Sequence, residues 1–190
     1  MTKAGPDTPS RRSVARDDSR IILGPMPDRA RMRTVDEQTV AAPIGVVFDI
    51  VANVTEWPKH LRHYRYVKFR SRAADGGGVV EMSANRPFRA IKWRTWWVSA
   101  MTVTPPRKSD RASIRFRHIE GITTGMDVEW EFHQKFSGLT HVRIVHVWNG
   151  PRWPVVGGIA ARRIIGPVFV HGIASRTLAG LAKVAERRES

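Results

Sequence analysis

Residues 40–69, VAAPIGVVFDIVANVTEWPKHLRHYRYVKF, contain the signals that decide the fold. Apolar residues recur at helical spacing between Val47 and Val54, which predicts a helix. Pro43 suits its first turn, because the missing N–H of proline would have no partner there. The preceding residues predict a short strand at about Arg33–Ala41. A strand followed by a helix therefore begins the ordered part of the chain.

A second short helical turn is predicted directly after the first helix. Thr55 is placed to cap it, and Trp57 and Leu61 would belong to it. His60 and His63 would then lie on one helical face, as zinc ligands sometimes do. The sequence marks no third ligand near them, and a strand begins here, so we expect no metal site.

The hydrophobic period changes to two after Leu61 and stays at two until about residue 149. Turn residues divide this region into about six strands, and the run Asp75–Gly78 is typical of a hairpin turn. This alternation predicts an antiparallel meander with one apolar face. The residues on the apolar parity are Val80, Met82, Ala84, Ile91, Trp93, Thr95, Trp97, Ser99, Met101, Val103, Ile114, Phe116, His118, Met126, Val128, Trp130, Phe132, Phe136, Val142, Ile144, His146 and Trp148.

The period becomes helical again from about Val155 to Arg188. Pro167 and the pair Gly157–Gly158 predict a kink in the first half of this helix. Its apolar stripe consists of Ile165, Val168, Phe169, Ile173, Leu178, Leu181 and Val184. This order of elements predicts an α+β domain in which the sheet curls around the final helix.

Composition limits the class of protein. The 190 residues, of which 42% are hydrophobic, suffice for one domain with a core. Residues 1–30 show little apolar periodicity, so we expect a disordered basic tail before a domain at residues 31–190. The absence of Cys excludes disulfides and thiol catalysis. No secretory signal is visible, and the apolar run Ile164–Ala174 is about half the length that spans a bilayer, so we expect a cytoplasmic protein.

The formal net charge of +15 favours anionic partners, although a generally arginine-rich proteome would explain it as well. Residues 60–72, HLRHYRYVKFRSR, have the composition of a nucleic-acid surface, but no nucleic-acid-binding motif accompanies them. We therefore expect no nucleic-acid partner. Trp153 and residues 155–169 instead have the composition of an interfacial helix, which favours peripheral contact with an anionic membrane surface.

The element order resembles that of the START-like polyketide cyclase and coenzyme-Q-binding superfamily, also called SRPBCC or Bet v 1-like. The resemblance covers roughly residues 33–188. It rests on residues 40–69, on HIEG at 118–121 and on IGPVFVHGIASRTLAGLAKVAERRE at 165–189. It implies the helix-grip fold, a curved antiparallel sheet of about six to seven strands around a long C-terminal helix, with two short helices after strand one. It also implies a cavity for a hydrophobic molecule and no cofactor.

The aromatase/cyclase branch of that superfamily gives some residues a role by resemblance. A Trp and a Tyr seven residues apart line the pocket in that branch, and Trp57 and Tyr64 match them. An inner strand there also carries a Trp, a Ser and an Arg at two-residue spacing, where the polar groups act on substrate oxygens. Trp97 and Ser99 match, but Met101 occupies the Arg position. A thioether cannot supply the charge-assisted hydrogen bonds of a guanidinium, which disfavours a cyclase.

Two histidines, His118 and His146, fall on the apolar parity of their strands. A neutral imidazole there would hydrogen-bond a ligand oxygen, such as a quinone carbonyl. The simpler alternative is a buried histidine that is satisfied by backbone or water.

We therefore expect a protein that binds a lipid, prenyl quinone or polyketide-like molecule for transfer or presentation. One alternative is a polyketide aromatase/cyclase, in which Tyr64, Ser99 and His118 transfer protons and an acidic acyl carrier protein docks on the basic rim. Another is a ribosome- or RNA-associated regulator. The expected ligand-binding residues are Trp57, Tyr64, Val80, Met82, Trp93, Trp97, Ser99, Met101, Phe116, His118, Trp130, Phe132, Ile144, His146, Phe169 and Ile173.

Overall fold

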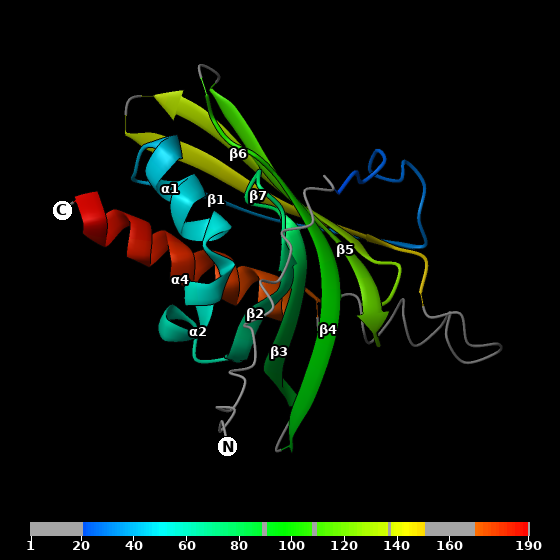
Figure 1. Ribbon diagram of the computed structural model, residues 1–190. Helices are drawn as coiled ribbons and strands as arrows, with labels where there is room; N and C mark the ends of the chain where they lie inside the picture. The colour runs from blue at the N-terminus through cyan, green and yellow to red at the C-terminus, as the bar shows by residue number, and fades with distance from the viewer. Residues whose placement is uncertain (1–20, 89–90, 108–109, 137, 151–169, 190) are drawn as a thin grey trace, which may run out of the picture.

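The computed structural model describes residues 21–88, 91–107, 110–136, 138–150 and 170–189 (Figure 1). Within these residues the chain forms one antiparallel sheet and three helices. The strands are β1 (Met32–Val40), β2 (Tyr64–Arg72), β3 (Gly78–Phe88), β4 (Ile91–Thr104), β5 (Arg111–Gly121), β6 (Asp127–Phe136) and β7 (Leu139–Trp148). The helices are α1 (Ile44–Ala52), α2 (Trp57–His60) and α4 (His171–Glu189).

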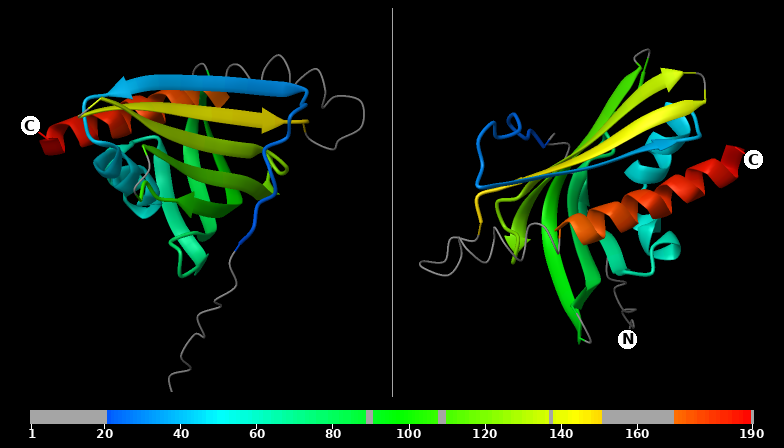
Figure 2. Two further views of the ribbon diagram at one scale, coloured as in Figure 1. Left: turned by 90° about the horizontal axis from the view of Figure 1, so that it is seen from above. Right: turned by 180° about the vertical axis from the view of Figure 1, so that it is seen from behind.

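The seven strands lie in the order β1-β7-β6-β5-β4-β3-β2, so β1 and β2 are the two edges. All neighbouring pairs are antiparallel, as the alternating pattern predicts. The sheet is strongly curved, and α1, α2 and α4 all lie on its concave side (Figures 1 and 2). The predicted α+β helix-grip fold is confirmed.

The connection from β1 to α1 is fixed by side chains of β6 and β7. Gln134 accepts a hydrogen bond from the backbone N–H of Ile44 at 2.8 Å, and the Thr140 hydroxyl donates to the Ala42 carbonyl at 2.7 Å. Pro43 directly precedes the helix. The predicted cap on the second helix is wrong, because Thr55 lies inside a 3-10 turn and its hydroxyl donates to the Asn53 side chain.

The inward parity of the strands is largely as predicted. Ile114, Trp130 and Ile144 come from three neighbouring strands and are all buried in one core cluster. Phe136 is an exception, because it is 74% exposed although its parity predicts burial. A register shift between Gln134 and Phe136 breaks the alternation there and turns the ring outward.

Helix α4 packs against β1, α1 and α2, and Leu178, Leu181 and Val184 are buried as predicted. His171, its first residue, lies 2.5 Å from the buried Asp36 carboxylate of β1. Burial raises the pKa of Asp36 above its ordinary value of 3.8, and the nearby imidazole opposes this shift. The predicted kink falls outside the described residues.

Residues 21–30 belong to the predicted tail and form no helix or strand. The carbonyl of Gly24 accepts a hydrogen bond from Arg115 at 2.5 Å, so this segment contacts the outer face of β5. Among the described residues, no helix has both the length and the apolar character needed to cross a bilayer.

Candidate functional site

The structure contains an interior cavity of about 70 Å³ between the concave face of the sheet and α4. Strands β2 to β7 contribute to its wall, and α4 lines its other side. The residues that line it are Trp57, Tyr64, Met82, Trp97, Ser99, Phe116, His118, Thr123, Met126, Val128, Trp130, Ile144, His146, Val170, Ile173, Ala174 and Thr177.

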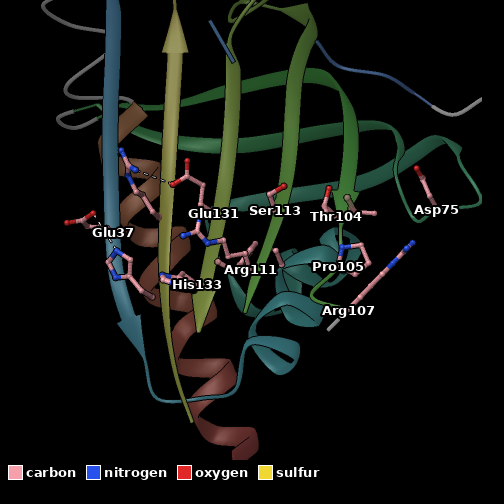
Figure 3. Close-up of a pocket in the computed structure, with 14 residues that line it drawn as sticks. Glu37, Asp75, Thr104, Pro105, Arg107, Arg111, Ser113, Glu131 and His133 are labelled. Atoms are coloured by element: carbon pink, nitrogen blue, oxygen red, sulfur yellow. Dashed lines mark hydrogen bonds and ion pairs between the residues drawn. The ribbon is translucent and has the colours of Figure 1, made fainter. Parts of the chain in front are cut away.

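A larger, open groove of about 1000 Å³ lies on the outer face of the sheet (Figure 3). Charged side chains from β1, β5, β6 and β7 line it, and several are already paired. Arg143 lies 3.2 Å from Glu131, and His141 lies 3.7 Å from Glu37. Because its charges are exposed and largely satisfy one another, we take the interior cavity as the candidate site.

Most of the residues predicted to bind a ligand meet at this cavity. Those on its wall are Trp57, Tyr64, Met82, Trp97, Ser99, Phe116, His118, Trp130, Ile144, His146 and Ile173. Val80, Met101 and Phe132 are also buried, but they contact the surrounding core and do not line the cavity. The Trp93 side chain and Phe169 lie outside the described part of the chain.

Sequence reasoning did not assign several of the lining residues. Val128 of β6 and Met126, directly before this strand, lie on the predicted inward parity, so this signal is sufficient to find them. Thr123 comes from the turn before β6, and Thr177 from a polar position on α4. No local pattern marks either threonine, because its place on the wall depends on how distant elements pack.

An aromatic cluster forms part of the cavity wall. Trp57 lies at its centre, with ring centroids 5.3 Å from Tyr64, 5.8 Å from Trp130 and 6.4 Å from Phe116. Its indole N–H donates to the Val51 carbonyl at 3.1 Å, which fixes the ring against α1. Edge-to-face and tilted contacts of this kind stabilise a rigid aromatic wall.

Polar atoms are concentrated where β4 and β5 pair. Ser99 and His118 are register partners, and both are buried. The His118 ring stacks on Trp97, and its Nδ1 lies 2.6 Å from the Thr123 hydroxyl. The Ser99 hydroxyl has no hydrogen-bond partner among the described residues. One ring nitrogen of His118 is thus already satisfied, whereas Ser99 retains capacity for a ligand atom.

The volume of the cavity restricts what fits without rearrangement. Water occupies about 30 Å³ per molecule, so the space is about that of two waters. Pockets for small organic molecules usually measure about 300–1,000 Å³. A larger guest therefore requires part of the wall to move.

Helix α4 is joined to the opposite side of the cavity through His63. The His63 Nε2 atom lies 3.0 Å from the hydroxyl of Thr177, a residue of α4 that is buried on the cavity wall. Burial lowers the pKa of His63 below its ordinary value of 6.5, and the positive charge of Arg176 adds to this effect. Within the described ranges, no three His, Asp or Glu side chains lie close enough to hold a metal ion, and His63 contacts Thr177 instead.

We expect His63 to make the protein less stable in mild acid. Because folding lowers its pKa, the unfolded chain binds this proton more readily, and stability falls as the pH drops below about 6.5 towards the folded pKa. Urea unfolding at about pH 7.5 and about pH 5 should show a smaller acid loss for His63→Gln than for wild type. His60→Gln, at an exposed position of α2, is the control. An equal acid loss in all three proteins would contradict this role.

Comparisons with known proteins identify related sequences and folds. A family model described as polyketide cyclase / dehydrase and lipid transport matches residues 40–165. No curated protein matches the chain. The Zhui aromatase/cyclase from Streptomyces sp. R1128 is 19% identical, with a TM-score of 0.68 over 83% of this chain and 95% of its own.

Two further solved structures are similar at lower scores. A START superfamily protein from Mycobacterium smegmatis is 16% identical, with a TM-score of 0.55 over 83% of this chain and 96% of its own. The di-domain aromatase/cyclase StfQ from the steffimycin biosynthetic pathway is also 16% identical, with a TM-score of 0.59 over 84% of this chain and 53% of its own. At these identities the similarity demonstrates the fold alone.

Proposed function

Because the chain belongs to the polyketide cyclase/dehydrase and lipid transport family, we propose that it binds a hydrophobic small molecule in the interior cavity and transfers or presents it. The bound molecule would be a lipid, a prenyl quinone or a polyketide-like molecule. The expected location of the protein is the cytoplasm. The observation that carries the proposal is the Ser99 hydroxyl, which is buried on the cavity wall and has no hydrogen-bond partner among the described residues. A ligand oxygen would satisfy it.

Apolar contact would supply most of the binding free energy, at about 25 cal/mol for each Å² removed from water before ordering costs. The cavity must widen first. Ile173, Ala174 and Thr177 of α4, with Val170 directly before the helix, form one side of the wall. Outward displacement of α4 would enlarge the cavity, and it would break the contacts of His63 with Thr177 and of His171 with Asp36.

Native mass spectrometry of freshly purified protein, followed by organic extraction, tests the proposal directly. We expect a bound hydrophobic molecule that survives purification and is released by solvent. Protein that is empty after purification and takes up neither a fluorescent fatty acid nor a short-chain prenyl quinone would overturn the proposal.

Ser99→Ala should have opposite effects on stability and on binding. An unsatisfied buried hydroxyl costs about 1 kcal/mol or more, so its removal should raise the free energy of unfolding of the empty protein slightly. The same change should weaken the binding of a short-chain prenyl quinone about 10-fold, because the quinone carbonyl loses its hydrogen-bond donor. Ser83→Ala is the matched control, since Ser83 is buried outside the cavity and donates to the Thr95 carbonyl at 3.0 Å. It should lower stability and leave quinone binding unchanged.

The second candidate is a polyketide aromatase/cyclase. It is supported by the convergence of Tyr64, Ser99 and His118 on one cavity, which is the set that such a reaction would use. The presence of buried Met101 at the position of the cyclase arginine disfavours it. Assay with a carrier-bound poly-β-ketone separates the two roles. A cyclase would turn the substrate over, and Ser99→Ala would slow it about 10²-fold.

A further inference from the structure

Three large apolar side chains are exposed together on the outer face of the sheet. Trp96 of β4 is 48% exposed, Ile119 of β5 is 43% exposed, and Ile122 in the following turn is 50% exposed. We call these three residues the Trp96 patch. The pairing of Trp97 with Gly121 places the next residues outward, Trp96 and Ile122, side by side.

The strands approach closely behind this patch. Gly121 has a φ of +97°, and a Cβ at this position would lie 2.6 Å from the Trp96 carbonyl oxygen. A side chain there would push β5 away from β4 or strain the backbone. The glycine therefore holds Trp96 and Ile122 next to each other on a rigid surface.

Charged side chains border the patch, and its one neighbouring carboxylate in the sequence, Glu120, is paired with Arg70 at 2.6 Å. Arg65 donates to the hydroxyl of Ser83, which is the register partner of Trp96, and Arg94 is exposed two residues before Trp96 on the same face. The chain as a whole carries a formal charge of +15. An aromatic ring beside isolated aliphatic side chains and arginines matches the interface of an anionic bilayer, where the rings enter the headgroup layer and the cations contact lipid phosphates and carboxylates.

The patch and the cavity lie on opposite faces of the sheet. The inner neighbours of the patch residues are Trp97, His118 and Thr123, which line the cavity. Contact with a bilayer at the patch would therefore leave the sheet itself between the lipid and the polar end of the cavity. We propose that the Trp96 patch docks this protein on the surface of an anionic membrane.

A second copy of the chain is a poorer occupant. Three side chains are far fewer than the roughly 20–30 residues that each partner usually contributes to a stable interface. Two copies would also bring together surfaces of the same charge, which opposes association.

Vesicle co-sedimentation tests the proposal with the full chain. Wild type should bind vesicles of phosphatidylcholine containing about 30% phosphatidylserine, and should bind pure phosphatidylcholine several-fold less. The double variant Trp96→Ser, Ile122→Ser should lose about 10-fold in partition to the anionic vesicles. Arg94→Glu should reduce the preference for anionic over neutral vesicles.

Phe136→Ser is the matched control. Phe136 is 74% exposed at the opposite end of β6, so this variant removes a comparable exposed ring outside the patch and should bind as wild type does. Circular dichroism should show that all variants remain folded. Three results would each overturn the proposal. The first is equal binding by the double variant and wild type, and the second is no binding by wild type. The third is self-association of wild type that the double variant abolishes.

Discussion

Trp57→Ala should lower the free energy of unfolding by about 3–5 kcal/mol, as expected for removal of a large buried aromatic side chain. Trp57 is buried between α1 and the sheet, where it contacts Tyr64, Phe116 and Trp130. Alanine would leave these rings without their common neighbour and the Val51 carbonyl without its donor. The loss therefore combines a cavity with an unsatisfied acceptor, and both effects have the same sign.

Denaturant unfolding of Trp96→Ala provides the comparison for this result. Trp96 has the same side chain, but it is about half exposed on the outer face, so its replacement should change the free energy of unfolding by about 0.5 kcal/mol or less. Similar losses in the two variants would show that the aromatic cluster around Trp57 is not the principal packing unit of the cavity wall.

The fold could be predicted because its signals are local. Helical spacing before Val54, strict alternation from Val80 to Trp148 and the return to helical spacing at the C-terminus each depend on neighbouring residues alone. Burial of Ile114 and Ile144 follows from that alternation. The incorrect predictions concern features that neighbours do not determine. The Phe136 parity depends on a register shift against β7, and the Thr55 cap depends on where a 3-10 turn begins.

The candidate site could be predicted only in part, for a related reason. Alternation identified which side chains point inward, but it could not distinguish those on the cavity wall from those in the solid core. Met82 and Met101 are both inward residues on adjacent strands, yet only Met82 lines the cavity. The size of the cavity and the contribution of Thr123 and Thr177 depend on ring packing and on the position of α4, which no periodicity specifies.

The two proposals make different demands on the same strands. Ligand binding requires α4 to move while β4 and β5 keep Ser99 and His118 in place. Membrane docking requires the outer face of the same two strands to remain rigid, and Gly121 maintains their close approach. A stable sheet with a displaceable helix would satisfy both demands, since the patch and α4 lie on opposite faces of the sheet.

Met101→Arg should destabilise the protein by about 3 kcal/mol or more, because a guanidinium would be buried without a counter-charge. Met101 is fully buried, and its register partners are Gly78 on β3, which has no side chain, and Phe116 on β5, whose ring offers no carboxylate or carbonyl acceptor. The position does not line the cavity, so the cation could not reach the water or ligand that would stabilise it there.

Met101→Leu is the control for this change, because it nearly conserves volume and should cost less than about 1.5 kcal/mol. Urea unfolding of both variants gives the comparison. If Met101→Arg were as stable as wild type, the inner face of β4 at this position would have to reach solvent or the cavity. An arginine there would then be accommodated as in the aromatase/cyclase pattern, and the departure at Met101 would no longer disfavour a cyclase. A large loss in Met101→Arg alone would instead show that this interior is built for apolar contact.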